Sequence, residues 1–139
     1  MDFLQPPGWP RARGYSNGIS ARGRTVVVSG MVGWDAECRF QTDDFAGQVR
    51  QALHNIVAVL AQGEAKAEHI VRMTWYVVDK REYVNAYKAI GDAYREIIGP
   101  HYPTMTAVQV VALIEDRARV EIEVTAIVPD EIHTEHVNG

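Results

Sequence analysis

Two glutamates, Glu121 and Glu123, lie two positions apart in a segment that alternates between apolar and polar residues. Residues i and i+2 of a strand share one face, so the two side chains would stand about 7 Å apart. At a surface that meets another subunit, a partly desolvated carboxylate would suit proton transfer. The alternative is a solvated strand face with Arg119 as a counter-ion, and ordinary antiparallel alternation favours it.

Tyr15 and the pair Ser29-Gly30 are further candidates for binding a small molecule. Tyr15 lies between Gly14 and Gly18, where its phenol could project from a flexible edge as a donor; a packing or surface tyrosine is the ordinary alternative. Ser29-Gly30 ends an apolar strand. A ligand could approach its backbone closely and bind a free N–H group, although a simple turn explains the pair equally well.

The histidines and the single cysteine form no metal-binding pattern, so no metal is expected. His101, beside Tyr102-Pro103, is the histidine of most interest, and a loop histidine is the favoured interpretation. Cys38 has no activating neighbour in the sequence and is interpreted as inert.

Four arginines, Arg11, Arg13, Arg22 and Arg24, cluster near the N-terminus. They could contact a phosphate backbone, but no stacking aromatic residues alternate with them and the formal net charge is −4. A solvated hairpin is the preferred interpretation, and the sequence gives no support for a nucleic-acid partner.

The composition predicts a single domain over residues 1–139 with 47% hydrophobic and 23% charged residues. Its core is expected at about 13–129, with an irregular Pro- and Gly-rich arm at 1–12 and a frayed end at 130–139. No signal peptide or membrane-spanning run is recognised, and one cysteine fits a reducing compartment, so the expected location is the cytoplasm, with no membrane partner.

The first half of the chain predicts a hairpin, a helix and a strand. Gly14–Ile19 and the β-branched run Thr25–Ser29 are expected to pair as the antiparallel hairpin. A helix should start at Thr42-Asp43 and stop at Gly63, because apolar residues recur at three- and four-residue spacing. Ile70–Val78 is rich in β-formers and is expected as a buried strand.

The second half predicts one helix and two strands. The helix should start at Asp79 and end at Gly99-Pro100, and the strands should cover Thr104–Leu113 and Ala118–Val128. The order ββαβαββ is an α+β class in which two helices cover one face of the sheet. The other face must be solvated or covered by a partner. Large apolar residues expected on it favour oligomerisation, with a pocket between subunits.

Several short motifs, in this order and spacing, resemble the YjgF/RidA family, the reactive intermediate deaminases formerly labelled endoribonuclease L-PSP or translation initiation inhibitors. The resemblance implies a chorismate-mutase-like fold (bacillus type) with a mixed or antiparallel sheet, and a homotrimer with intersubunit clefts for a small-molecule ligand. It also implies hydrolysis of enamines and imines to 2-keto acids and ammonia, with no cofactor. The motifs are Gly14-Tyr15-x-x-Gly18, Val28-Ser29-Gly30, Gln48-x-x-Gln51-Ala52-Leu53-x-Asn55-Ile56, Tyr102-Pro103 and Val120-Glu121-Ile122-Glu123-x-x-Ala126.

The resemblance assigns roles to four residues. Glu121 would be the catalytic, water-orienting glutamate, and Tyr15, Ser29 and Gly30 would bind the substrate.

Three positions depart from the family pattern. Met105 stands where active deaminases have an arginine that binds the substrate carboxylate bidentately. Ala107 stands in place of a cysteine and Tyr87 in place of an asparagine. A methionine cannot bind a carboxylate, so a divergent subfamily and a less anionic, more apolar or aromatic ligand are expected, with Trp34 or Trp75 nearby.

Three functions are therefore possible: an imine or enamine hydrolase, a trimer that binds a metabolite without chemistry, and RNA processing. The only support for RNA processing is the old family label. A basic side chain such as Arg72, Arg119 or His101 beside Glu121 would replace the lost arginine.

Overall fold

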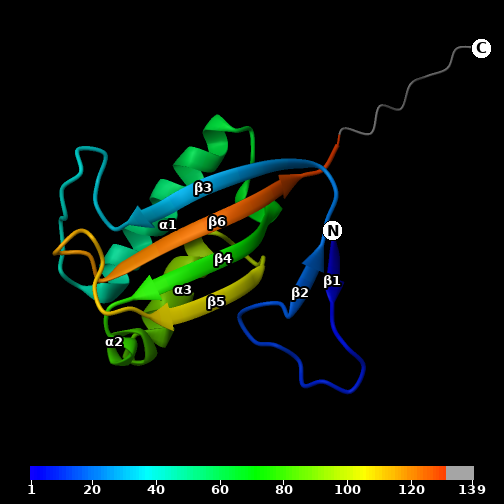
Figure 1. The fold of residues 1–139 in the computed structure, drawn as a ribbon, viewed down its shortest axis with the longest axis horizontal. Coiled ribbons are helices and arrows are strands. Elements are labelled where there is room, and N and C mark those ends of the chain that lie inside the picture. The colour runs from blue at the N-terminus through cyan, green and yellow to red at the C-terminus, as the bar shows by residue number, and fades with distance from the viewer. Residues whose placement is uncertain (131–139) are drawn as a thin grey trace, which may run out of the picture.

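Four strands form a mixed sheet of order β3-β6-β4-β5 in the computed structural model, which describes residues 1–130. Only β4 and β5 run parallel; the other neighbours are antiparallel. Figure 1 shows α1 and α3 together behind this sheet, with its open face toward the viewer. This arrangement confirms the predicted α+β class. The elements are β1 Asp2–Leu4, β2 Gly18–Ser20, β3 Arg24–Val32, α1 Phe45–Gln62, a 3-10 turn Ala67–His69, β4 Ile70–Val77, α2 Lys80–Asn85, α3 Tyr87–Ile97, β5 Thr104–Gln109 and β6 Val120–Val128.

Helix α1 ends at the predicted Gly63, but its N-terminal cap is Asp44, one residue after the predicted start at Thr42-Asp43. The Asp44 carboxylate accepts a hydrogen bond from the Gly47 N–H at 2.9 Å, and Gly63 closes the helix through bonds to Leu60 and Ala61 carbonyls. Its buried stripe of Phe45, Gln48, Val49, Ala52, Leu53, Ile56 and Leu60 packs on the sheet.

The alternation of β6 divides the sheet into two different faces. Val120, Ile122 and Val124 are buried beneath the helices, whereas Glu121 and Glu123 project from the open face. The open face is less apolar than expected. Its exposed apolar side chains include Val27 and Val108, but threonines and charged residues lie between them.

Two polar side chains of α1 fix the loops that enter the sheet. The buried Gln48 amide donates to the Arg117 carbonyl at 2.9 Å and accepts from the Arg119 N–H at 2.8 Å, which holds the start of β6. Asn55 donates to the carbonyls of Val32, the last residue of β3, and of Trp34 just beyond it. Both residues belong to the motif that resembles the RidA family, and here they support the fold.

The second predicted helix is two helices. Asp79 caps α2 as expected, accepting from the Arg81 N–H, but Ala86 leaves the helical conformation with φ −101° and ψ 10°. Its N–H bonds to the carbonyls of Glu82 and Tyr83, so the last turn tightens and α3 restarts at Tyr87.

The predicted hairpin between Gly14–Ile19 and Thr25–Ser29 is wrong. Strand β2 pairs with β1 in a separate two-stranded sheet, with Phe3 opposite Ile19, and Figure 1 shows this ribbon beside the main sheet. The arm at 1–12 is therefore not wholly irregular. The physical reason lies before β2, where the Ser16 N–H bonds to the Pro103 carbonyl and leaves only Gly18–Ser20 to pair with the arm.

Strand β5 also stops at Gln109, four residues short of its predicted end. The fraying predicted from residue 130 onward lies almost wholly outside the described residues. In the described part of the chain, no helix is both long and apolar enough to cross a membrane.

Candidate functional site

A β-bulge in β3 brings Ser29 and Gly30 against the open-face carboxylate of β6. Val28 pairs with Val124 and Met31 with Ile122, so Ser29 and Gly30 together oppose Glu123 alone. A Cβ built on Gly30 would lie 2.7 Å from Cδ of Glu121 and 3.1 Å from its Oε1. Only glycine permits this approach, so the structure groups the predicted residues Ser29, Gly30 and Glu121. We call them the carboxylate half-site.

The two glutamates of β6 have different partners. The Tyr76 hydroxyl donates to Oε1 of Glu123 at 2.7 Å, and this hydrogen bond is the main reason that the pKa of Tyr76 is raised. Within residues 1–130 no side-chain hydrogen bond or ion pair engages Glu121. Glu121 is therefore the carboxylate that is free to accept a proton or orient a water molecule.

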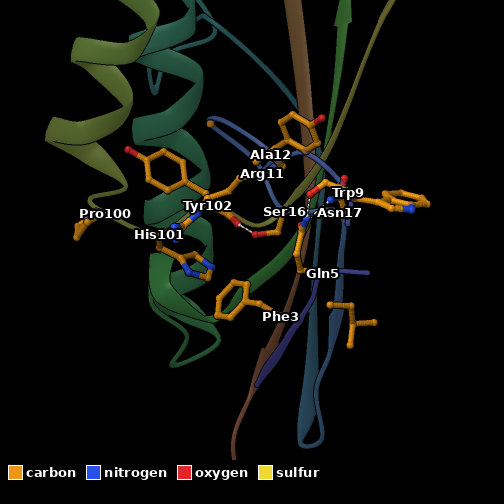
Figure 2. A pocket seen from close by; sticks show the side chains of 13 residues that line it. Phe3, Gln5, Trp9, Arg11, Ala12, Ser16, Asn17, Pro100, His101 and Tyr102 are labelled. Atoms are coloured by element: carbon orange, nitrogen blue, oxygen red, sulfur yellow. Dashed lines mark hydrogen bonds between the residues drawn. The ribbon is translucent and has the colours of Figure 1, made fainter. Parts of the chain in front are cut away.

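Tyr15 is held close to β5 by its neighbour in the sequence. Oγ of Ser16 donates to the Tyr102 carbonyl at 2.5 Å, and Ser16 forms an isolated parallel bridge with Thr104. Figure 2 shows this bond in a pocket of about 750 Å³ between the N-terminal arm and the Tyr102 loop. These contacts place the Gly14-Tyr15 and Tyr102-Pro103 motifs side by side, although 87 positions separate Tyr15 from Tyr102.

Tyr15, Tyr87 and Met105 meet at a second pocket of about 710 Å³, which we call the aromatic cavity. Its remaining walls include Ile90 and Gly91 of α3 and two arginines. Tyr83 contacts Trp75 and Tyr87 edge to face, with ring centroids 6.0 and 5.2 Å apart. The aromatic side chains of the cavity are Tyr15, Trp75, Tyr83, Tyr87, Tyr94 and Tyr102.

The buried tyrosines of the aromatic cavity are neutral donors. Burial raises the pKa of Tyr83 and of Tyr94 above the ordinary range. The Tyr94 hydroxyl donates to the His101 carbonyl at 2.6 Å, and its ring stacks on Tyr102. The indole Nε1 of Trp75 is buried and has no acceptor among residues 1–130. The part of the cavity wall formed by Trp75, Tyr83 and Tyr94 is therefore aromatic and uncharged.

The two groups of predicted residues lie on opposite faces of the sheet. Trp75 and Tyr76 are successive residues of β4; Trp75 borders the aromatic cavity under the helices, and Tyr76 is the cross-strand neighbour of Glu121. Met105 shares the helix side with its neighbour Met73. Within one copy, the aromatic cavity and the carboxylate half-site are thus separated by the sheet, and Ala107, exposed on β5, lines neither.

Of the three proposed substitutes for the lost arginine, Arg72 is the one that lies with a glutamate of the open face. Arg119 pairs with Glu82 at 2.7 Å, and Nε2 of His101 lies 2.6 Å from the Ile70 carbonyl, which makes His101 a structural residue. Arg72 lies with Glu123 in a small pocket of the open face. The expected neighbour Trp75 does line the aromatic cavity, whereas Trp34 packs on Phe40 elsewhere.

The aromatic cavity contains residues that sequence reasoning did not place in a site. The sequence predicts a solvated cluster around Arg13 and a helix that contains Tyr83, Tyr94 and Arg95, and all four residues line the cavity. The signal was present in the spacing of Tyr83, Tyr87 and Tyr94, which favours one aromatic stripe. Among residues 1–130 no cluster of three or more His, Cys, Asp or Glu side chains could hold a metal ion.

Residues 9–128 match the family model described as Endoribonuclease L-PSP. The chain therefore belongs to this family, which is also known as the RidA/YjgF family and which the sequence motifs predicted.

Particular relatives carry more specific names. The chain is 30% identical to the 2-iminobutanoate/2-iminopropanoate deaminase of Capra hircus over 105 residues, 75% of this chain and 73% of that protein. It is 28% identical to the deaminase of the same name from Escherichia coli K12 over 116 residues, 81% of this chain and 86% of that protein. The crystal structure of the Rid family protein YyfB from Yersinia pestis superposes with a TM-score of 0.81 at 26% identity, covering 91% of this chain and 98% of that one.

Proposed function

We propose that this protein is an imine or enamine hydrolase that releases a carbonyl product and ammonia. Relatives at about 30% identity are named as deaminases of small 2-imino acids, which supports this class of reaction. The single structural observation that carries the proposal is the packing of the Glu121 carboxylate against the bulged backbone at Gly30. A proton acceptor beside an exposed polar backbone is what hydration of a C=N bond requires.

The chemistry needs one water molecule and no cofactor. The water oxygen forms a bond to the imine carbon while Glu121 accepts a proton from that water. Glu121 returns the proton to the nitrogen, which gives a carbinolamine. The carbinolamine then breaks its C–N bond as its hydroxyl proton passes to the nitrogen, which gives the carbonyl and ammonia. Ser29 and the Gly30 N–H hold a polar group of the substrate, and Tyr15 closes the site.

The complete site is shared between copies of the chain in a homotrimer. The aromatic cavity and the carboxylate half-site lie on opposite faces of one sheet, so one copy cannot present both to the same small molecule. A neighbouring copy that covers the open face with its aromatic cavity would join them.

The direct test is hydrolysis of imines generated from amino acids by an amino-acid oxidase, followed by semicarbazide trapping of the remaining imine. Wild-type protein should accelerate imine loss, and Glu121→Gln should reduce the rate about 100-fold or more, the typical contribution of a general base. Glu123→Gln, on the same face, is the matched control and should stay within a few-fold of wild type. A Glu121→Gln rate equal to wild type would overturn the proposal.

A metabolite-binding trimer without turnover is the second candidate. Met105 favours it, because the apolar side chain lines the aromatic cavity where active deaminases have their arginine. Tight binding of carboxylates with no acceleration of any imine in the panel would select it.

A further inference from the structure

The aromatic cavity has a positive rim. Its lining includes two arginines, Arg13 from the N-terminal segment and Arg95 from α3, and no acidic residue. Arg13 is exposed and forms no ion pair within residues 1–130. The Arg13 guanidinium is therefore available to a bound anion.

The Arg95 guanidinium occupies the space beside Gly91, where α3 has no side chain. A Cβ built on Gly91 would come within 3.3 Å of Nη1 of Arg95, so the guanidinium rests over the glycine at the cavity edge. Nη2 of Arg95 donates to Asp92 at 2.6 Å, and Asp92 also accepts from Lys88 at 3.2 Å. One carboxylate cannot neutralise two cations, so this cluster keeps a net positive charge beside the cavity.

The body of the cavity has the opposite character. Six aromatic side chains, Ile90 and Met105 surround a volume of about 710 Å³, which is larger than a side chain of two or three carbons needs. An anionic head at the rim and an apolar or aromatic body inside would match the two parts of the cavity.

We propose that Arg13 and Arg95 bind the substrate carboxylate, and that the site takes 2-imino acids with a large apolar or aromatic side chain. In this proposal the substrate carboxylate is bound at the rim of the aromatic cavity and not at position 105 of β5. Met105 then forms part of the cavity wall. This inference rests on the proposed hydrolase for its reaction but not for its binding. It departs from the expectation of a less anionic ligand and keeps the expectation of an apolar or aromatic one.

Binding of three stable probes to the full chain tests the inference without turnover. Isothermal titration should show 3-phenylpropanoate binding at least about tenfold more tightly than its neutral amide or than propanoate, because a charged hydrogen bond and an apolar body each contribute. Arg13→Gln and Arg95→Gln should each weaken 3-phenylpropanoate about tenfold and leave the amide unchanged. Arg22→Gln, an exposed arginine outside the cavity, is the matched control and should bind as wild type.

Equal affinity for the carboxylate and the amide would overturn the inference, as would Arg13→Gln and Arg95→Gln proteins that retain wild-type selectivity. The two proposals fail separately. If selective binding is found but no imine is hydrolysed, the hydrolase is wrong and the carboxylate site stands. If imines are hydrolysed and both arginine variants keep the wild-type preference, the hydrolase stands and the arginine assignment is wrong.

Discussion

The contact between Gly30 and Glu121 determines where the carboxylate can lie. Since a Cβ on Gly30 would come within 2.7 Å of Cδ of Glu121, any side chain there must displace the carboxylate. We predict that Gly30→Ala reduces imine hydrolysis about 100-fold, close to the effect of Glu121→Gln. Steady-state kinetics on both variants measures this.

The double variant shows whether the two residues act together. If Gly30→Ala acts by moving Glu121, adding it to Glu121→Gln should cause little further loss. Independent effects that multiply in the double variant would contradict the account, and an unchanged thermal unfolding midpoint for Gly30→Ala separates displacement from unfolding.

At the scale of elements, Gln48 connects α1 to the strand that carries Glu121. Its buried amide satisfies the Arg117 carbonyl and the Arg119 N–H, and a leucine of similar size leaves both without partners. We predict that Gln48→Leu lowers the free energy of unfolding by about 2–4 kcal/mol. Urea unfolding should show no comparable change for Gln62→Leu, because Gln62 is exposed on the same helix; equal stability of the two variants would contradict this role.

Tyr94 connects α3 to the segment before β5, and its titration gives a pH-dependent prediction. Burial raises the pKa of Tyr94 in the folded state, so the folded chain holds this proton more strongly than the unfolded chain. Stability from this group is complete below the unfolded pKa of about 10 and is lost as pH rises above it. Tyr94→Phe should cost about 1 kcal/mol at pH 8, from the lost bond to the His101 carbonyl, and should lose less stability than wild type between pH 8 and 11. Urea unfolding across that pH range measures this. The prediction would be contradicted if the free energy of unfolding fell equally with pH in wild type and in Tyr94→Phe.

The sequence predicted most elements because their signals are local. The stripe of α1, its end at Gly63 and the alternation of β6 follow from local residue patterns, although the helix is capped by Asp44 and not by Thr42 or Asp43. The pairing of β2 could not be predicted in this way, because it depends on the hydrogen bond between Ser16 and Pro103, which are far apart in the chain. The division of the second helix at Ala86 also carries no glycine or proline signal.

The structure brings most of the predicted site residues together, but in two separate groups. The Gly30–Glu121 approach and the Tyr15–Met105 cavity group six of the seven candidates, and Ala107 remains outside both. Nothing in the order of the motifs indicates that a sheet separates the two groups. No local pattern indicates that Arg13 lies at the cavity, because its segment is held there by the contact of Ser16 with the distant Tyr102 carbonyl.

At the scale of the whole molecule, we propose that the site needs two copies of the chain. In a trimer each site would take its aromatic cavity from one copy and its carboxylate half-site from another. Tyr15→Ala removes a side chain of the aromatic cavity, and Glu121→Gln removes the carboxylate of the half-site. Tyr15 is 43% exposed and Glu121 lies on the open face, so neither change should disturb the core.

Co-refolding the two inactive variants is therefore the most direct measurement. Equal amounts should recover up to about one quarter of the wild-type imine hydrolysis, because about one site in four would combine two intact halves. Activity that stays at the level of the separate variants, while size measurements show that mixed oligomers have formed, would contradict a site shared between copies.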